Sequence, residues 1–304
     1  MKLSVEYPSI AFREGPQKVL DLARAIEDIG YDEIAVFDHV VMGYPTDDRP
    51  APMYPPRMPV LEAIVLLAQV AAVTERVSLS TEVLVLPQRQ PVLVAKQVST
   101  IDSLSGGRVR LGVGVGWQES EYEALEEDFS NRGKRMDEAI RLLRAYWGDD
   151  QIDYEGDHYQ SRAMAMEPKP PQGRDLPIWI GGGSTAALRR VAELGDGWMG
   201  AALADVEDIT KMVTTITGHA ESIGRDPNEI GMQMMLQPPP RRREDMAYYA
   251  NHDLVVARAE MIKGLGFDWL SLNATAVYQA GARSVDAMID ELAALHSKIR
   301  AATG

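Results

Sequence analysis

Short apolar runs alternate with helix-forming segments about eight times along this chain of 304 residues. The runs lack a regular alternation of apolar and polar residues, which is typical of strands covered on both faces. Alternating strands and helices predict a parallel sheet, and eight such units predict its closure into an α/β fold, the (β/α)8 TIM barrel. The predicted strands are residues 3–7, 33–37, 77–85, 109–114, 178–181, 197–200, 231–236 and 269–272.

Two segments interrupt this alternation. Residues 41–59 are rich in proline and too long for a simple connection, so they predict a lid loop over the barrel mouth. Residues 148–176 predict a β-hairpin or extended insertion before the fifth strand. Predicted helices at residues 17–29, 91–104 and 132–147 carry an apolar stripe. We expect residues 1–304 to form a single barrel domain, with both insertions at its C-terminal face.

Composition excludes several classes of function. The chain has no cysteine, which removes disulfides, thiol nucleophiles and thiolate metal sites. Its five histidines are scattered, so we expect no metal site. A net charge of −14 argues against nucleic acid and anionic membranes as partners. The first residues lack the pattern of a signal peptide, and the apolar stretch 63–73 is too short to span a bilayer, so we expect a cytoplasmic location.

A glycine-punctuated strand follows a Ser-Gly-Gly turn at residues 104–117. Gly112, Gly114 and Gly116 fall on one face of the strand, which predicts that a backbone or a flat ligand approaches closely there. A dinucleotide fingerprint would require a glycine where Trp117 stands, so the segment is not one. Trp117 lies at the mouth end of this strand, where it is expected either to wall a planar ring or to close the barrel top as ordinary core.

Polar residues at strand ends are the candidates for chemistry, because ligands of such barrels bind at the C-terminal ends of the strands. Asp38 and His39 end the second strand. A neutral imidazole exchanges a proton near pH 7, so His39 is the predicted acid–base group and Asp38 is expected to tune its pKa or to orient it. The alternative is a partly buried histidine beside a carboxylate that caps the loop.

A carboxylate intrudes on the apolar third strand at Thr81-Glu82-Val83. A buried, unpaired carboxylate is costly, so Glu82 is expected to reach the mouth or to pair with Arg89 or Arg108. An ion pair without functional importance and a role in the site are equally compatible with this pattern.

Gly181, Gly182, Gly183 and Ser184 follow the fifth predicted strand and open a helix. Such a turn presents backbone N–H groups, a side-chain cap and the positive end of a helix dipole, which together favour a phosphate. A tight turn with a cap is the simpler alternative. Arg241, Arg242 and Arg243 follow the seventh strand on the same side, where a solvated loop is the simpler interpretation of each arginine.

These motifs together resemble the bacterial luciferase-like monooxygenase superfamily, and more narrowly its branch of probable coenzyme F420-dependent oxidoreductases. The resemblance is carried by Asp38-His39, by STEVLVLPQRQPVLVAKQVSTIDSLSGGRVRLGVGVGW, by EYEAL, by FSNRGKRMDEAIRLLRAYW, and by PPQGRDLPIWIGGGS with LGDGW. It is strong over residues 1–200 and rests on strand count beyond them.

The resemblance implies a bacterial luciferase-like barrel with a flavin or deazaflavin ring at its mouth, against a bulge in the third strand. Thr81, Glu82, Val83, Gly114, Gly116 and Trp117 would then lie by the ring, and Gly181 to Ser184 by its phosphate. Relatives carry a non-prolyl cis peptide in the bulge, which maps to Glu82–Val83 or to the bond before it. His39 aligns with the active-site histidine of sugar-phosphate dehydrogenases, but their glutamate near the end of the fourth strand falls close to Trp117. That departure argues against glucose 6-phosphate as the substrate.

The resulting hypothesis is an F420-dependent oxidoreductase that transfers a hydride between the deazaflavin and a small organic substrate, with His39 as proton donor or acceptor. The first alternative is an FMN-dependent monooxygenase that uses reduced flavin and O2. The second is a non-catalytic, cofactor-binding barrel. The resemblance also suggests a homodimer.

Overall fold

A computed structural model describes residues 1–201, 205–237 and 248–304. Its strands are β1 (Lys2–Tyr7), β2 (Glu33–Val36), β3 (Ser78–Thr81), β4 (Leu84–Val85), β5 (Val109–Gly114), β6 (Ile152–Glu155), β7 (Gln160–Met164), β8 (Ile178–Gly181), β9 (Gly197–Gly200), β10 (Gly231–Met235) and β11 (Trp269–Asn273). Its α-helices are α1 (Pro16–Ile29), α2 (Ala63–Ala71), α3 (Pro91–Ser105), α4 (Glu119–Ala124), α5 (Arg132–Gly148), α6 (Thr185–Leu194), α7 (Val206–Ser222), α8 (His252–Gly264), α9 (Ala274–Ala280) and α10 (Val285–Thr303). Four short 3-10 helices are η1 (Ser9–Glu14), η2 (Leu86–Gln88), η3 (Gly173–Asp175) and η4 (Pro227–Glu229).

The main sheet is parallel and closed, in the order β3-β2-β1-β11-β10-β9-β8-β5-β4, with β3 also paired to β5. Strands β3 and β4 share one barrel position, because Leu79 pairs with Val109 and Leu84 pairs with Val113 on the same neighbour, β5. The predicted (β/α)8 TIM barrel is therefore confirmed. The predicted third strand is continuous in the sequence but is divided at a cis peptide bond between Glu82 and Val83, one of the two bonds to which the resemblance pointed.

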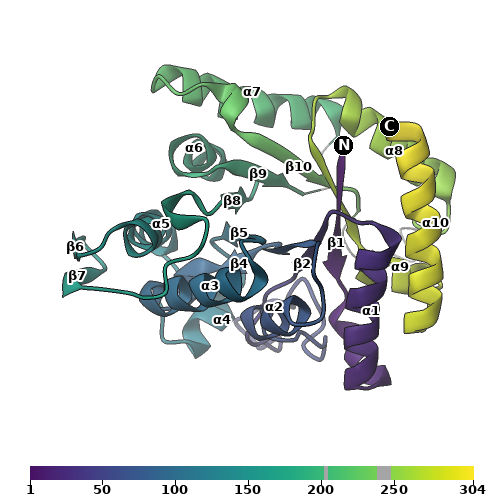
Figure 1. Ribbon diagram of the computed structural model, residues 1–304, viewed down its shortest axis with the longest axis horizontal. Helices are drawn as coiled ribbons and strands as arrows, with labels where there is room; N and C mark the ends of the chain where they lie inside the picture. Colours follow the sequence, from purple (N-terminus) through teal and green to yellow (C-terminus); the bar gives the residue numbers. More distant parts are fainter. Residues whose placement is uncertain (202–204, 238–247) are drawn as a thin grey trace.

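Helices cover the outside of the barrel. Figure 1 shows α1, α8 and α10 together on one side and α3 with α5 on another, with the β6–β7 hairpin beyond α5. The strands read as apolar runs because they are buried on both faces, against the helices outside and against one another inside. The antiparallel β6–β7 pair confirms the hairpin predicted within residues 148–176.

The barrel interior is polar near the start of its strands. Arg110 of β5 makes an ion pair with Glu33 of β2 and donates a hydrogen bond to Gln233 of β10. Its guanidinium carbon lies 4.2 Å from the ring centroid of Trp179 and 4.3 Å from that of Trp269. Because the arginine is 6% exposed and its partners are buried, this cluster closes the barrel floor with paired charges.

Candidate functional site

His39 lies just beyond β2 and is held by a glutamate from a distant segment. Its Nδ1 is 2.9 Å from Oε2 of Glu121 on α4, and both side chains are buried. Burial raises the pKa of Glu121, but the hydrogen bond and charge of His39 and the amide of Val40 outweigh it, so its pKa lies below the ordinary value. A carboxylate on Nδ1 fixes the orientation and tautomer of a histidine and leaves Nε2 as the nitrogen for proton exchange.

Glu121 also holds the start of the loop at residues 41–59. Its Oε1 accepts hydrogen bonds from the backbone N–H groups of Val40, at 2.5 Å, and Val41, at 3.2 Å. Gln118 adds a second connection, since its Nε2 donates to the Val41 carbonyl at 2.7 Å. One short helix, α4, therefore positions both the histidine and the first residues of the loop.

Asp38 does not orient His39, so that part of the prediction is wrong. Its Oδ2 accepts a hydrogen bond from the Val85 amide at 2.9 Å, and its Oδ1 pairs with Arg89 at 2.7 Å. Burial raises the pKa of Asp38, against the opposing effect of Arg89. Asp38 therefore fastens the end of β2 to β4, while Glu121 takes the role that the sequence assigned to it.

Aromatic rings surround His39 at the mouth. Its ring centroid is 5.0 Å from Phe37, 5.4 Å from Trp117 and 6.0 Å from Tyr54, all edge-on. Tyr54 of the loop also meets Trp117 at 6.0 Å. Trp117 is 37% exposed, so it forms part of an open wall and is not closed core.

Glu82 faces the barrel interior and pairs with neither arginine that was expected. Ser271 of β11 donates a hydrogen bond to its Oε2 at 2.6 Å. Arg89 is bound to Asp38 and Glu62, and Arg108 donates to Thr74 and to backbone carbonyls. The side chain of Glu82 points inward, toward β11, so it does not pair with either arginine.

Burial raises the pKa of Glu82 to about 7, since the hydrogen bond from Ser271 and the charge of Arg110 only partly offset it and the charge of Glu33 adds to it. Glu6 of β1, whose Oε1 accepts from Asn273 at 2.7 Å, also has a pKa well above its ordinary value through burial and the charge of Glu82. The two carboxyl groups therefore form one interacting pair inside the barrel.

The glycines of β5 and β8 make room for the neighbouring chain. A Cβ on Gly112 would lie 2.0 Å from the Thr81 carbonyl oxygen, and Cβ atoms on Gly114 and Gly181 would lie 2.7 Å and 2.9 Å from Val83. Thr81 itself donates a hydrogen bond to the Gly112 carbonyl at 2.5 Å. The sequence predicted that a backbone or a ligand approaches these glycines. In the structure the space beside them is filled by the chain itself, at Thr81 and Val83. Gly116 lies beyond β5, with φ of +69°.

The turn from Gly181 to Ser184 leads into α6. Ser184 caps the helix, accepting from the Ala187 amide at 3.2 Å, and Gly182, with φ of +120°, accepts from Trp198 Nε1 at 2.8 Å. Gly182, Gly183 and Ser184 are exposed. Because a helix leaves its first N–H groups without intrahelical partners, this turn presents donors and positive potential to solvent.

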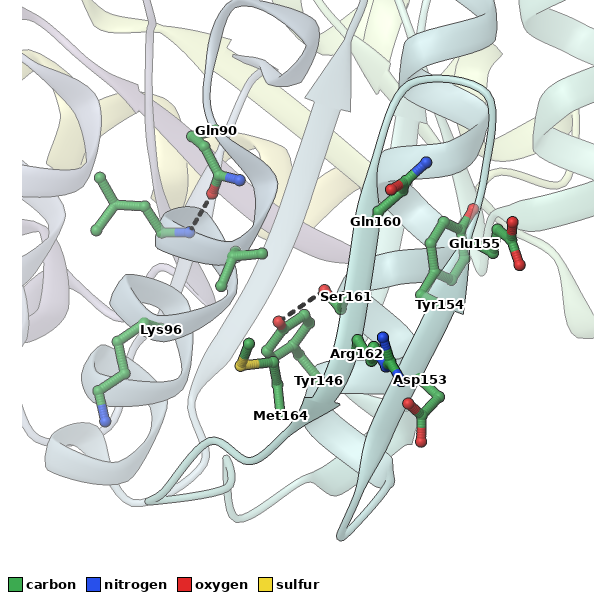
Figure 2. Close-up of a pocket in the computed structure, with 12 residues that line it drawn as sticks. Gln90, Lys96, Tyr146, Asp153, Tyr154, Glu155, Gln160, Ser161, Arg162 and Met164 are labelled. Atoms are coloured by element: carbon green, nitrogen blue, oxygen red, sulfur yellow. Dashed lines mark hydrogen bonds between the residues drawn. The ribbon is translucent and has the colours of Figure 1, made fainter.

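The structure has a cavity beside Trp117 and a larger groove at the β6–β7 hairpin. The lid cavity, about 680 Å³, lies between residues 43–53 and residues 117–123 and includes Trp117 in its wall. A larger groove of about 1200 Å³ lies between α3 and the β6–β7 hairpin, where the Tyr146 hydroxyl meets Ser161 (Figure 2). Of the predicted site residues, Trp117 lines the lid cavity and none lines the hairpin groove. The ring of Trp117 lies 5.4 Å from that of His39.

The sequence matches the luciferase-like monooxygenase family over residues 4–289. The chain belongs to this family. It is accordingly an oxidoreductase. It is 35% identical over 213 residues to an uncharacterized protein of Mycobacterium tuberculosis, covering 68% of this chain and 72% of that protein. It is 30% identical over 234 residues to the F420-dependent glucose-6-phosphate dehydrogenase of Nocardia farcinica, covering 75% and 66% of the two chains.

Solved structures of similar fold include proteins with different described activities. An F420-dependent secondary alcohol dehydrogenase in complex with an F420-acetone adduct aligns with a TM-score of 0.78 at 18% identity, over 99% of this chain and 100% of that one. A monooxygenase from Streptomyces bottropensis aligns with a TM-score of 0.73 at 19% identity, over 96% and 98%. These likenesses establish the fold.

Glu121 is the important residue of the candidate site that sequence reasoning missed. It stands in the EYEAL motif, four residues after Trp117. It brings a carboxylate to His39 from a position four residues beyond the one to which the resemblance pointed. Arg241, Arg242 and Arg243 lie outside the described residues.

Within the described ranges, the structure shows no cluster of three or more His, Asp or Glu side chains suited to a metal ion. Over the same ranges, no helix is long and apolar enough to cross a membrane.

Replacing Glu82 by glutamine is expected to raise stability more at pH 8 than at pH 5. The pKa of Glu82 is higher in the folded protein than in the unfolded chain, so the bound proton stabilises the wild-type fold. This stabilisation is fully present below the ordinary pKa and is lost as pH rises through about 7. The neutral amide removes this pH dependence. The unfolding free energy of the variant minus that of wild type should therefore increase by roughly 1–3 kcal/mol from pH 5 to pH 8. Urea unfolding at both pH values measures it. Glu155→Gln, in the exposed hairpin, is the matched control, and a difference that does not vary with pH would contradict the assignment.

Proposed function

We propose that this protein is a coenzyme F420-dependent oxidoreductase that transfers a hydride between the deazaflavin and a small organic substrate. The observation that carries the proposal is the His39–Glu121 pair, 2.9 Å apart at the barrel mouth and next to the exposed ring of Trp117. A histidine held in this way can exchange one proton with a bound molecule at each turnover. Relatives named for F420 dependence support the choice of cofactor.

The residues present fit a planar cofactor with a phosphate group on its side chain, a feature that F420 and FMN share. Val83, partly exposed between Gly114 and Gly181, offers an apolar surface at the mouth, with Thr81 and Glu82 before it in the chain. Gly116 lies against Val85, two residues after Val83. The exposed turn from Gly181 to Ser184 offers backbone donors to the phosphate. Bound F420 would supply the two-electron hydride chemistry, while the protein positions the ring, excludes water and moves a proton at His39.

Equilibrium titration of the purified protein with F420 and with FMN tests this proposal. We expect the dissociation constant for F420 to be at least tenfold lower, which corresponds to about 1.4 kcal/mol. Tighter binding of FMN would instead support the FMN-dependent monooxygenase, a second candidate of the same fold. Absence of binding by either cofactor would overturn both. The homodimer and the cytoplasmic location stay predictions from the sequence.

Substitution of Gly183 by valine is expected to raise the F420 dissociation constant at least tenfold, about 1.4 kcal/mol, because the side chain blocks close approach of a phosphate to the backbone. Gly183 is better suited than Gly182, whose φ of +120° would add backbone strain to any substitution. The nearest atom to a Cβ at Gly183 is the flexible end of Met212, at 3.2 Å.

Isothermal titration of the Gly183→Val variant measures the effect. The control is Gly218→Val on α7, where a Cβ meets nothing within 4 Å. If the Gly183→Val variant is folded and binds as tightly as wild type, the turn is only a helix start.

A further inference from the structure

The lid cavity is placed to receive a second molecule one aromatic ring, that of Trp117, away from the predicted acid–base group. Trp117 lines it, and the Trp117 ring lies 5.4 Å from that of His39. Gln118 and Glu121 tie the loop that forms its other wall to α4 and to the end of β2. A molecule in this cavity would therefore contact the Trp117 ring, which also packs against His39.

The cavity carries an unbalanced negative charge. Asp48, Glu119 and Glu123 line it, and Arg49 is the one cation among its lining residues in the described part of the chain. Arg49 is already paired with Glu123. Asp48 accepts a hydrogen bond from Thr46 at 2.6 Å, which lowers its pKa and keeps it ionised. After the Arg49–Glu123 pair is set aside, the carboxylates of Asp48 and Glu119 remain.

The same cavity has an apolar wall. Trp117 and Met53, which are 37% and 45% exposed, line it together with Pro50, Ala51 and Pro52. Apolar walls with a few charged groups bind the body of a ligand by burial and select its polar end by charge. Here the charge would attract a cation and repel an anion.

We propose that the lid cavity is the substrate pocket and that it selects hydrophobic molecules bearing a positive charge, such as aryl-alkyl amines, over carboxylates and phosphate esters. The inference rests on the proposed function for the word substrate, but the charge preference of the cavity stands on its own geometry.

Three probes of similar shape and different charge test the proposal: benzyltrimethylammonium, benzyl alcohol and phenylacetate. Saturation-transfer NMR and isothermal titration at low ionic strength should give an affinity at least tenfold higher for the cation than for the anion, with the alcohol between them. The preference should shrink severalfold in 0.5 M salt, because the carboxylates are solvent-exposed. Equal or tighter binding of phenylacetate, or no binding of any probe, would overturn the proposal.

Two neutralising variants locate the effect. Asp48→Asn and Glu119→Gln should each lower the cation-to-anion affinity ratio by about two- to fivefold, since exposed charges act through solvent. Glu155→Gln removes the same charge from the hairpin groove and should leave the ratio unchanged. An equal effect of all three would mean that net charge alone is responsible, which contradicts the proposal.

The cofactor titration keeps the two hypotheses apart. Selective binding of the ammonium probe by a protein that does not bind F420 would overturn the proposed function and retain the charge-selective pocket. Tight F420 binding with no preference among the probes would do the reverse.

Discussion

A His39→Ala variant is expected to turn over roughly 10² to 10⁴ times more slowly than wild type, with a cofactor dissociation constant within a few fold. The reason is that a general acid–base group acts on the transition state and contributes little to binding of the ring. A panel of enones, imines and alcohols, assayed with oxidised and reduced cofactor, identifies the substrate with which kcat is measured.

Two further variants distinguish proton transfer from packing. His39→Asn should not restore kcat, because an amide forms hydrogen bonds but does not titrate near neutral pH. Glu121→Gln retains an acceptor near Nδ1 but removes the charge, so it should lower kcat less and shift its pH profile. A kcat near the wild-type value in both histidine variants would show that His39 is only a wall of the pocket.

The largest loss of stability is expected from Arg110→Met. The substitution leaves Glu33, which is fully buried, without the guanidinium that neutralises it, and removes the cation between Trp179 and Trp269. Removing one member of a buried ion pair costs about 3–5 kcal/mol, chiefly because the other charge stays buried. Guanidinium unfolding at pH 7 measures the change in free energy.

A double variant tests that explanation. Adding Glu33→Leu to Arg110→Met should recover stability, since no uncompensated charge remains inside the barrel. Arg162→Met in the hairpin groove, which removes an arginine at the surface, is expected to change the unfolding free energy by less than about 0.5 kcal/mol. A loss below about 1 kcal/mol for Arg110→Met would show that the cluster is not a structural ion pair.

The strands could be read from the sequence because their pattern reports burial, which is a local property. All eight predicted strands coincide with observed ones to within a few residues. The hairpin was equally readable, since turn residues separate its two strands. What the sequence could not supply is which buried polar group meets which. His39 and Glu121 are 82 residues apart, and Glu82 and Ser271 are 189 residues apart.

The errors share this cause. Asp38 was assigned to His39 because the two are adjacent, but successive residues at a strand end point in opposite directions, so Asp38 reaches β4 while His39 reaches α4. Arg89 and Arg108 follow Glu82 in the sequence, but the side chain of Glu82 points inward to Ser271 of β11. The cofactor residues of the glycine turn and the third-strand bulge came from family resemblance and stay predictions.

Val83 connects three strands in a way that constrains how this barrel can diverge. Its two methyl groups occupy the space that side chains at Gly114 and Gly181 would fill, at 2.7 Å and 2.9 Å. The three positions therefore share one volume, although 98 residues separate the first from the last. Divergent sequences should keep the sum of the three side-chain volumes constant and let the individual residues vary, so an alanine at position 114 or 181 would accompany a smaller residue at 83. Substitutions at positions 83, 114 and 181 should therefore be accepted together and not one at a time.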